Sequence, residues 1–173
     1  WSGGKITKDS GIPGNLNKRE LYETANKINQ KFVDIIRKTG GNNAYRHLLI
    51  PGYDTDIENT TIDQISYGED KDGDGQKEKY TIDDPFKMPT DLTCNGKNRL
   101  FLSVHCYTPG GFCLDEAKDT YTYETQEALK SELSLLKKFS DDGYAVILGE
   151  CGVVSPRTVT GSVSKWLEDA FTT

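Results

Sequence analysis

Apolar positions along this chain alternate between a helical spacing and short continuous runs. Over residues 18–38 an apolar residue recurs at steps of three and four, which predicts an amphipathic helix. The residues of this stripe are Leu21, Ala25, Ile28, Phe32 and Ile35. Asn17 can cap the first turn together with Glu20 three residues on, and Gly40-Gly41 end the helix.

Three apolar runs are too short for helices and are typical of buried strands. They lie at about residues 48–50, 99–107 and 144–149. Helices are expected at about 123–139 and 163–171, after the second and third runs. Residues 54–98 form a long polar segment, and such segments are usually functional or contain small elements of their own.

This order predicts an α/β fold with a parallel sheet covered by helices. Three strands buried on both faces cannot cover themselves well, so the pattern is that of an incomplete piece of a larger barrel or sheet. The 173 residues suffice for one domain but not for a complete (β/α)₈ barrel, which needs about 250.

Charge and hydropathy exclude two classes of partner. The formal net charge of −6 argues against nucleic acid, which attracts basic patches. A membrane-spanning helix needs about 18 apolar residues in a row, and no run approaches that length.

The main candidate for chemistry is a carboxylate at a strand end. Glu150 follows the run Val146–Gly149, and parallel β/α folds build their active sites at the carboxyl ends of strands. His105 and Tyr107 end the preceding strand at alternate positions and therefore point to one face. A histidine and a tyrosine hydroxyl beside a carboxylate can hold it ionised and oriented.

An acidic loop is the second candidate. Asp70, Asp72, Asp74 and Gly75 match positions 1, 3, 5 and 6 of a calcium loop, but Thr81 occupies the position of the bidentate glutamate. A Ca²⁺ site and a solvated acidic turn both remain open. No phosphate loop or dinucleotide fingerprint is present, and no cofactor is expected to be required.

The four cysteines show no Cys-x-x-Cys pair and do not indicate a zinc site. Cys106 and Cys151 lie in apolar segments and are expected to be buried free thiols. Cys94 and Cys113 flank one strand and are the better candidates for a disulfide.

Four segments resemble glycoside hydrolase family 5, on its cellulase and endoglucanase side. They occur in the order of the family and extend over most of the chain. The segments are residues 40–53 (GGNNAYRHLLIPGY), 84–89 (DPFKMP), 104–109 (VHCYTP) and 146–152 (VILGECG).

The resemblance implies a (β/α)₈ TIM barrel of which residues 1–173 form a partial catalytic domain, matching strands five to seven. Enzymes of this family are retaining β-glycanases with two glutamates. Glu150 matches the nucleophile, and His105 and Tyr107 match the active-site histidine and tyrosine. The Asn-Glu-Pro motif of the acid/base glutamate and the sugar-stacking tryptophan of the eighth strand are not found in this sequence.

The expected function is thus that of a portion of a retaining endo-β-1,4-glucanase acting on plant cell-wall β-glucan, secreted from the cell. The chain alone is expected to be inactive unless a second chain supplies the remaining part of the barrel. Two alternatives stay open: a noncatalytic fragment that binds β-glucan by stacking on Tyr53, Tyr107 and Phe112, and an assembly piece such as a split half-barrel.

Overall fold

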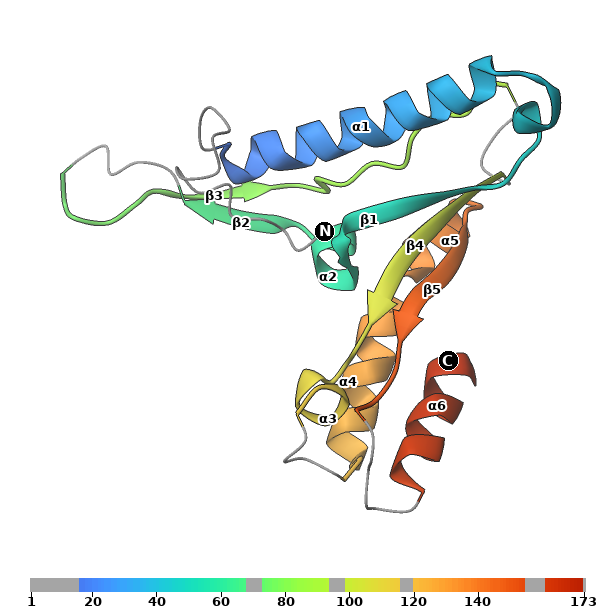
Figure 1. The fold of residues 1–173 in the computed structure, drawn as a ribbon. Helices are drawn as coiled ribbons and strands as arrows, with labels where there is room; N and C mark the ends of the chain where they lie inside the picture. The colour runs from blue at the N-terminus through green and yellow to red at the C-terminus, as the bar shows by residue number, and fades with distance from the viewer. Residues whose placement is uncertain (1–15, 68–72, 94–98, 116–119, 155–160, 173) are drawn as a thin grey trace.

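A parallel sheet of three strands organises the chain in this computed structural model (Figure 1). Its strands are β1 (Leu48–Asp56), β4 (Leu100–Cys106) and β5 (Ala145–Cys151), in the order β1-β4-β5. The residues described are 16–67, 73–93, 99–115, 120–154 and 161–172. The expected α/β class with parallel strands is confirmed, with each strand within a few residues of its apolar run.

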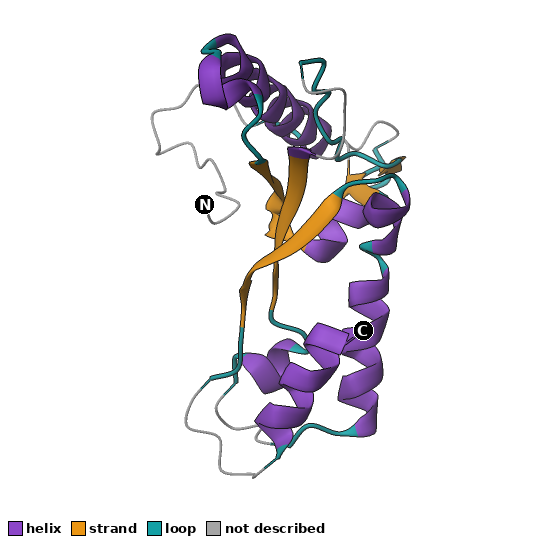
Figure 2. Ribbon diagram, turned by 90° about the vertical axis from the view of Figure 1, so that its right-hand side faces the viewer, coloured by secondary structure: helices purple, strands orange, loops and turns teal. Residues whose placement is uncertain are grey.

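Helices precede and follow the strands. The longest, α1 (Lys18–Lys38), lies before β1, and Figure 2 shows α4 and α5 on one side of the strands. The shorter helical elements are η2 (Gly41–Ala44), α3 (Gly110–Cys113), α4 (Tyr123–Ser134), α5 (Lys137–Asp141) and α6 (Ser162–Thr172). In the part of the chain that the structure describes, no helix is long and apolar enough to cross a membrane.

The single helix expected over residues 123–139 is two helices. The amides of Leu135 and Leu136 donate to the carbonyls of Glu132 and Leu133, three residues back instead of four. Such tighter turns interrupt an α-helix. Leucine spacing continues across the break, which is why the sequence pattern predicts one element.

The polar segment at 54–98 contains structure of its own. β1 extends to Asp56, whose side chain caps the short helix α2 (Ile57–Thr61) by accepting from the Asn59 amide at 2.7 Å. Two strands, β2 (Gln64–Tyr67) and β3 (Lys79–Ile82), then pair antiparallel. Elements of four or five residues are too short to produce a recognisable period.

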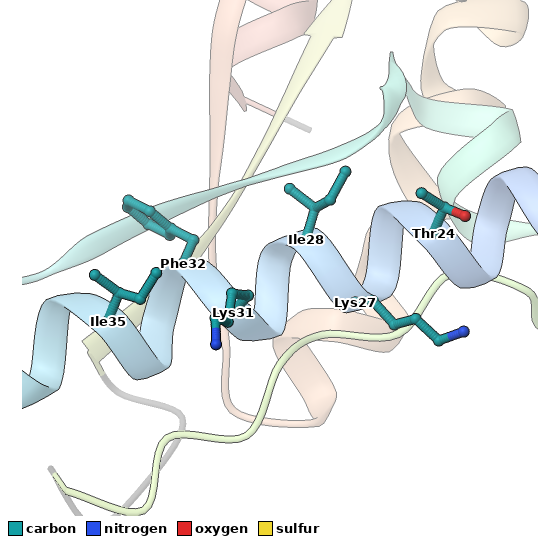
Figure 3. A pocket seen from close by; sticks show the side chains of 6 residues that line it. All are labelled: Thr24, Lys27, Ile28, Lys31, Phe32 and Ile35. Atoms are coloured by element: carbon teal, nitrogen blue, oxygen red, sulfur yellow. The ribbon is translucent and has the colours of Figure 1, made fainter. Parts of the chain in front are cut away.

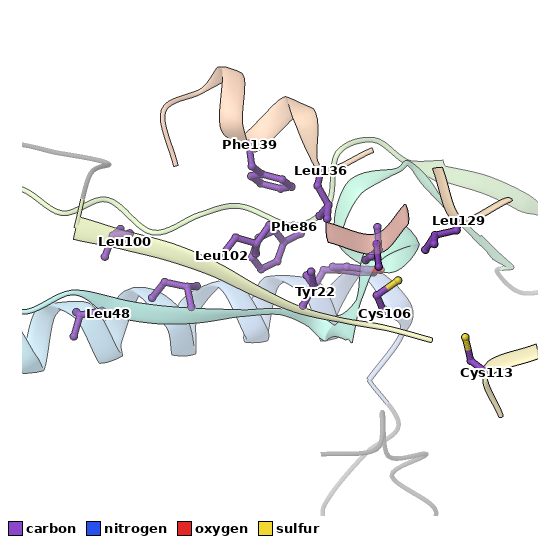
Figure 4. Packing of buried hydrophobic residues seen from close by; sticks show 14 of the residues in the cluster. Tyr22, Leu48, Phe86, Leu100, Leu102, Cys106, Cys113, Leu129, Leu136 and Phe139 are labelled. Carbon is purple, nitrogen blue, oxygen red and sulfur yellow. The ribbon is translucent and has the colours of Figure 1, made fainter. Parts of the chain in front are cut away.

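The core lies on one face of the sheet. Leu100, Leu102 and Val104 of β4 are fully buried, whereas the alternate residues Phe101 and Ser103 are partly exposed. The buried residues of β1 and β4 join side chains of α1, α4 and α5 in one cluster (Figure 4). One covered and one open face produce the clean alternation along β4.

Helix α1 has the bounds and the capping box expected from the sequence. The Asn17 side chain accepts from the Glu20 amide at 3.0 Å, and the Glu20 carboxylate accepts from the Asn17 amide at 2.8 Å. Near its end Arg37 forms a buried ion pair with Asp91 at 2.8 Å. This pair ties the helix to the segment that precedes β4.

The apolar stripe of α1, however, does not face the sheet. The buried residues of the helix are Tyr22, Asn29, Val33 and Arg37. Ile28, Phe32 and Ile35 are 59%, 40% and 51% exposed and lie along the same side of the helix (Figure 3). The described residues therefore leave an apolar helix face in contact with solvent.

Candidate active site

Glu150 lies near the carboxyl end of β5, directly opposite His105 of β4 in the parallel register. Gly149 makes this close approach feasible. A Cβ atom at Gly149 would lie 2.7 Å from Ser103 Oγ, nearer than side-chain atoms normally approach. A glycine at this position therefore lets the end of β5 pack closely against β4.

Two side chains from the end of β4 converge on one oxygen of Glu150. The Tyr107 hydroxyl donates to Oε2 at 3.1 Å, and His105 Nδ1 lies 3.4 Å from the same oxygen. The hydrogen bond with Glu150 raises the pKa of Tyr107, because the carboxylate favours the protonated phenol. The Glu150 side chain is 58% exposed and that of His105 is 31% exposed, so both are accessible to a ligand.

The chain beyond Tyr107 is anchored in the core. The buried indole of Trp166 on α6 donates from Nε1 to the Thr108 carbonyl oxygen at 2.8 Å. The Thr108 hydroxyl donates to the half-buried carboxylate of Glu132 on α4, whose pKa is raised by burial. These contacts fix the backbone that carries Tyr107.

The end of β1 contributes a residue that sequence analysis missed. Thr55 Oγ1 lies 3.1 Å from His105 Nδ1. A lone threonine at a strand end carries no sequence signal. Its place depends on an irregularity in the register of β1 with β4 between Pro51 and Asp56.

Of the three residues expected to stack on sugar, Tyr107 contacts Glu150, and the other two are placed differently. Tyr53 is partly buried, and its ring stacks on Tyr22 with centroids 3.8 Å apart. Phe112 is 1% exposed and packs against Tyr121 in the core. A sugar ring cannot stack on a side chain that is so deeply buried, so sugar stacking on Phe112 would require this side chain to become exposed.

The described residues do not test the calcium hypothesis, because they contain only part of the acidic loop. Asp70 and Asp72 lie outside them. Asp74 is exposed, and its Oδ1 accepts from the Gln76 amide at 2.7 Å. Among the residues that the structure describes, no group of three or more His, Cys, Asp or Glu side chains could hold a metal ion.

Cys106 and Cys151 are free thiols, with Cys106 buried and Cys151 partly buried, and Cys113 is buried and not in a disulfide. This agrees with the expectation for Cys106 and Cys151. Cys113 is not disulfide-bonded in this structure, contrary to its preferred pairing, and Cys94 lies outside the described residues. Burial raises the pKa of Cys106 to about 11, so its thiol stays protonated near neutral pH.

Comparisons with known proteins identify the family of the chain. Residues 8–171 match the family model described as Cellulase (glycosyl hydrolase family 5). Endoglucanase A of Paenibacillus barcinonensis is 31% identical over 171 residues, covering 86% of this chain and 38% of that protein. A xyloglucan-specific endo-beta-1,4-glucanase of Bacteroides ovatus is 28% identical and covers 82% of this chain and 26% of its own length.

Solved structures that resemble this chain belong to the same family. A mutant glycoside hydrolase 5 lichenase from a Caldicellulosiruptor species, in complex with cellotetraose, superposes with a TM-score of 0.69 at 28% identity. The match covers 96% of this chain and 40% of the lichenase chain. A broad-specificity endoglucanase from an uncultured bovine rumen ciliate superposes with a TM-score of 0.66 at 25% identity, covering 93% and 43%.

The chain thus spans well under half the length of each of these relatives, at a share of 26–43%. The range that matches the family model includes the parallel strands that carry His105 and Glu150. The chain belongs to the cellulase family, glycosyl hydrolase family 5.

Proposed function

We propose that this chain carries the nucleophile of a retaining endo-β-1,4-glucanase, and that the nucleophile is Glu150. The observation that carries the proposal is the convergence of the Tyr107 hydroxyl and His105 Nδ1 on Oε2 of Glu150, at 3.1 and 3.4 Å. Hydrogen-bond donors on a carboxylate hold it in one orientation. An exposed, oriented carboxylate is suited to attack a sugar carbon.

In the proposed reaction a carboxylate oxygen of Glu150 attacks the anomeric carbon. The bond to the glycosidic oxygen breaks, and a proton from a general acid leaves with the departing sugar. Water then hydrolyses the glycosyl-enzyme ester, and two inversions give net retention. The general acid has to lie about 5–5.5 Å from the nucleophile.

We place the acid/base glutamate outside this chain. The sequence contains no Asn-Glu-Pro segment of the kind that carries it in this family. The chain alone is therefore proposed to be inactive on polymeric substrate. It functions together with the remaining part of the barrel, on the same polypeptide or on a second chain.

The surface of α1 supports the need for further β/α units. Ile28, Phe32 and Ile35 form an exposed apolar surface on this helix, and β1 and β5 are the two edges of the sheet (Figure 3). Uncovered apolar faces and unpaired strand edges are features that proteins cover by packing. Neighbouring units of a barrel would cover both.

The substrate class follows from the relatives. Those relatives are named as endoglucanases, a xyloglucan-specific endoglucanase and a lichenase complexed with cellotetraose. We therefore propose a β-1,4-linked glucan of the plant cell wall as substrate. A polymer of that size requires an enzyme that acts outside the cell.

The proposal is tested by comparing Glu150→Gln with Glu127→Gln in hydrolysis of soluble β-glucan by the assembled protein. Glu127 is a half-exposed glutamate of α4 that pairs with Lys130 at 3.8 Å, so its variant controls for loss of a charge. We expect Glu150→Gln to abolish release of reducing ends and Glu127→Gln to leave it unchanged. Wild-type turnover in Glu150→Gln would contradict the proposal. Binding of cello-oligosaccharide without hydrolysis by the wild type would favour a noncatalytic function.

A further inference from the structure

The end of β1 adopts an unusual backbone conformation beside His105. Asp54 and Thr55 both have φ of 55°, in the left-handed region. This region is disfavoured for residues other than glycine, and most of all for β-branched ones such as threonine. Such a conformation is strained and is typically retained at functional sites.

The strained segment brings Thr55 to the imidazole of His105. The register of β1 with β4 shifts between Pro51 and Asp56, and Asp56 is then paired with His105. Thr55 Oγ1 lies 3.1 Å from His105 Nδ1 and donates to the Asp54 carbonyl oxygen at 2.6 Å. A regular β1 would keep its register with β4 and would not need the two left-handed residues.

These contacts determine which ring nitrogen of His105 carries the hydrogen. A hydroxyl has one hydrogen, and the Asp54 carbonyl can only accept, so the hydrogen of Thr55 points to Asp54. Oγ1 is then left to accept from Nδ1. The second neighbour of Nδ1, Oε2 of Glu150 at 3.4 Å, is also an acceptor when the carboxylate is ionised.

We propose that Thr55 is a positioning residue that holds neutral His105 in the tautomer with hydrogen on Nδ1. This inference rests on the proposed function, because it assigns Thr55 a role in orienting the partner of Glu150. In this tautomer Nδ1–H is shared between Thr55 and Glu150, and Nε2 is an acceptor. The imidazole then adds a second donor to the oxygen that Tyr107 already contacts.

The tautomer is measured directly by NMR of protein labelled with ¹⁵N-histidine, at an alkaline pH where free imidazole is neutral. The sequence has two histidines, so His105→Gln assigns the signals. His47 is an internal control. Its Nε2 lies 3.3 Å from Arg99, which can only donate, so His47 also carries its hydrogen on Nδ1.

Two variants separate the hydroxyl from the shape of the side chain. Thr55→Val retains the β-branch and its backbone preference but cannot accept from Nδ1. Thr55→Ser retains the hydroxyl. We expect hydrogen on Nδ1 of His105 in the wild type and in Thr55→Ser, and a shift toward hydrogen on Nε2 in Thr55→Val, with His47 unchanged in all three.

An Nε2–H tautomer in the wild type would overturn the inference, as would an unchanged tautomer in folded Thr55→Val. If Thr55→Val does not fold, the decision rests on the wild type and Thr55→Ser, which must both carry hydrogen on Nδ1. The measurement needs no substrate and no turnover. A failure of Glu150 as nucleophile would appear in the hydrolysis assay and would leave the tautomer result unaffected.

Discussion

The hydroxyl of Tyr107 donates to Oε2 of Glu150 across two neighbouring parallel strands, over 3.1 Å. Tyr107 follows β4 and Glu150 lies within β5, so this bond links the ends of two strands. The two residues are 43 positions apart in the sequence. Because the bond is made to a charged group in an exposed setting, its contribution is to orientation and charge more than to folding.

Tyr107→Phe should therefore impair chemistry without unfolding the protein. Loss of the hydrogen bond that orients the nucleophile should lower the rate of glycosyl-enzyme formation by about 10-fold or more. The rate is measured with an activated aryl cellobioside. Tyr123→Phe, at a 70% exposed position, is the control and should have no effect. An unchanged rate in Tyr107→Phe would contradict the assigned role.

Gly149→Ala should destabilise the site through a steric conflict with Ser103. The added Cβ would lie 2.7 Å from Ser103 Oγ, and overpacking of this kind costs about 1–3 kcal/mol. Ser103→Ala removes that oxygen and should restore most of the free energy of unfolding in the double variant. Gly152→Ala is the matched control, because a Cβ at this position would meet no atom of the described residues within 4 Å apart from its chain neighbours. Denaturant unfolding of the four variants decides the question; equal losses in Gly149→Ala and Gly152→Ala would refute it.

The buried phenol of Tyr22 predicts a loss of stability at alkaline pH. Burial, followed by the nearby Tyr53, Asp56 and Asp54, raises its pKa above the ordinary value of about 10. The folded state keeps the proton at a pH where the unfolded state has lost it. The contribution of the Tyr22 phenol to the free energy of unfolding is therefore complete below about pH 10. It declines as the pH rises toward the higher pKa of the folded state.

Tyr22→Phe removes that titration, so its free energy of unfolding should fall less steeply above about pH 10 than that of the wild type. At neutral pH the variant should be about 1 kcal/mol less stable, because Tyr22 donates to the Asn59 carbonyl oxygen at 2.8 Å. Urea unfolding between about pH 8 and pH 11 measures both effects. Parallel pH profiles would show that Tyr22 does not carry the effect.

The exposed apolar surface of α1 predicts that a charge substituted there costs more stability than a charge substituted at another exposed position. If further β/α units cover Phe32 in the assembled protein, Phe32→Glu buries an unpaired charge and should cost more than about 2 kcal/mol. Leu114→Glu, at a 59% exposed position away from α1, should change the free energy of unfolding by less than about 0.5 kcal/mol. Equal effects of the two substitutions would mean that Phe32 stays in solvent.

Local sequence pattern was sufficient for the elements and for part of the site. Residues 18–38 form one helix with the expected Asn17–Glu20 capping box, because caps and helical periods act within a few residues. The strand-end rule also brought His105 and Glu150 together, since parallel neighbours align their carboxyl ends. Both interpretations use information that lies within single elements or adjacent strands.

Other features depend on packing that a sequence pattern does not contain. Phe112 is as aromatic as a sugar-stacking residue but is buried against Tyr121. The proposed role of Thr55 depends on two left-handed residues and a register shift. The neighbouring sequence predicts neither of these features. The buried face of α1 includes the polar residues Asn29 and Arg37. A prediction based on hydrophobicity alone therefore places the opposite face of the helix against the sheet.

The most direct test of the central claim is to trap the glycosyl-enzyme. A dinitrophenyl 2-fluoro-β-cellobioside reacts with the nucleophile without help from a general acid, because its leaving group needs no proton. We expect the protein to gain the mass of one fluorocellobiosyl group, located by peptide mass spectrometry on Glu150 and absent in Glu150→Gln. A label on a different carboxylate, or an unchanged label in Glu150→Gln, would contradict the assignment of Glu150 as the nucleophile.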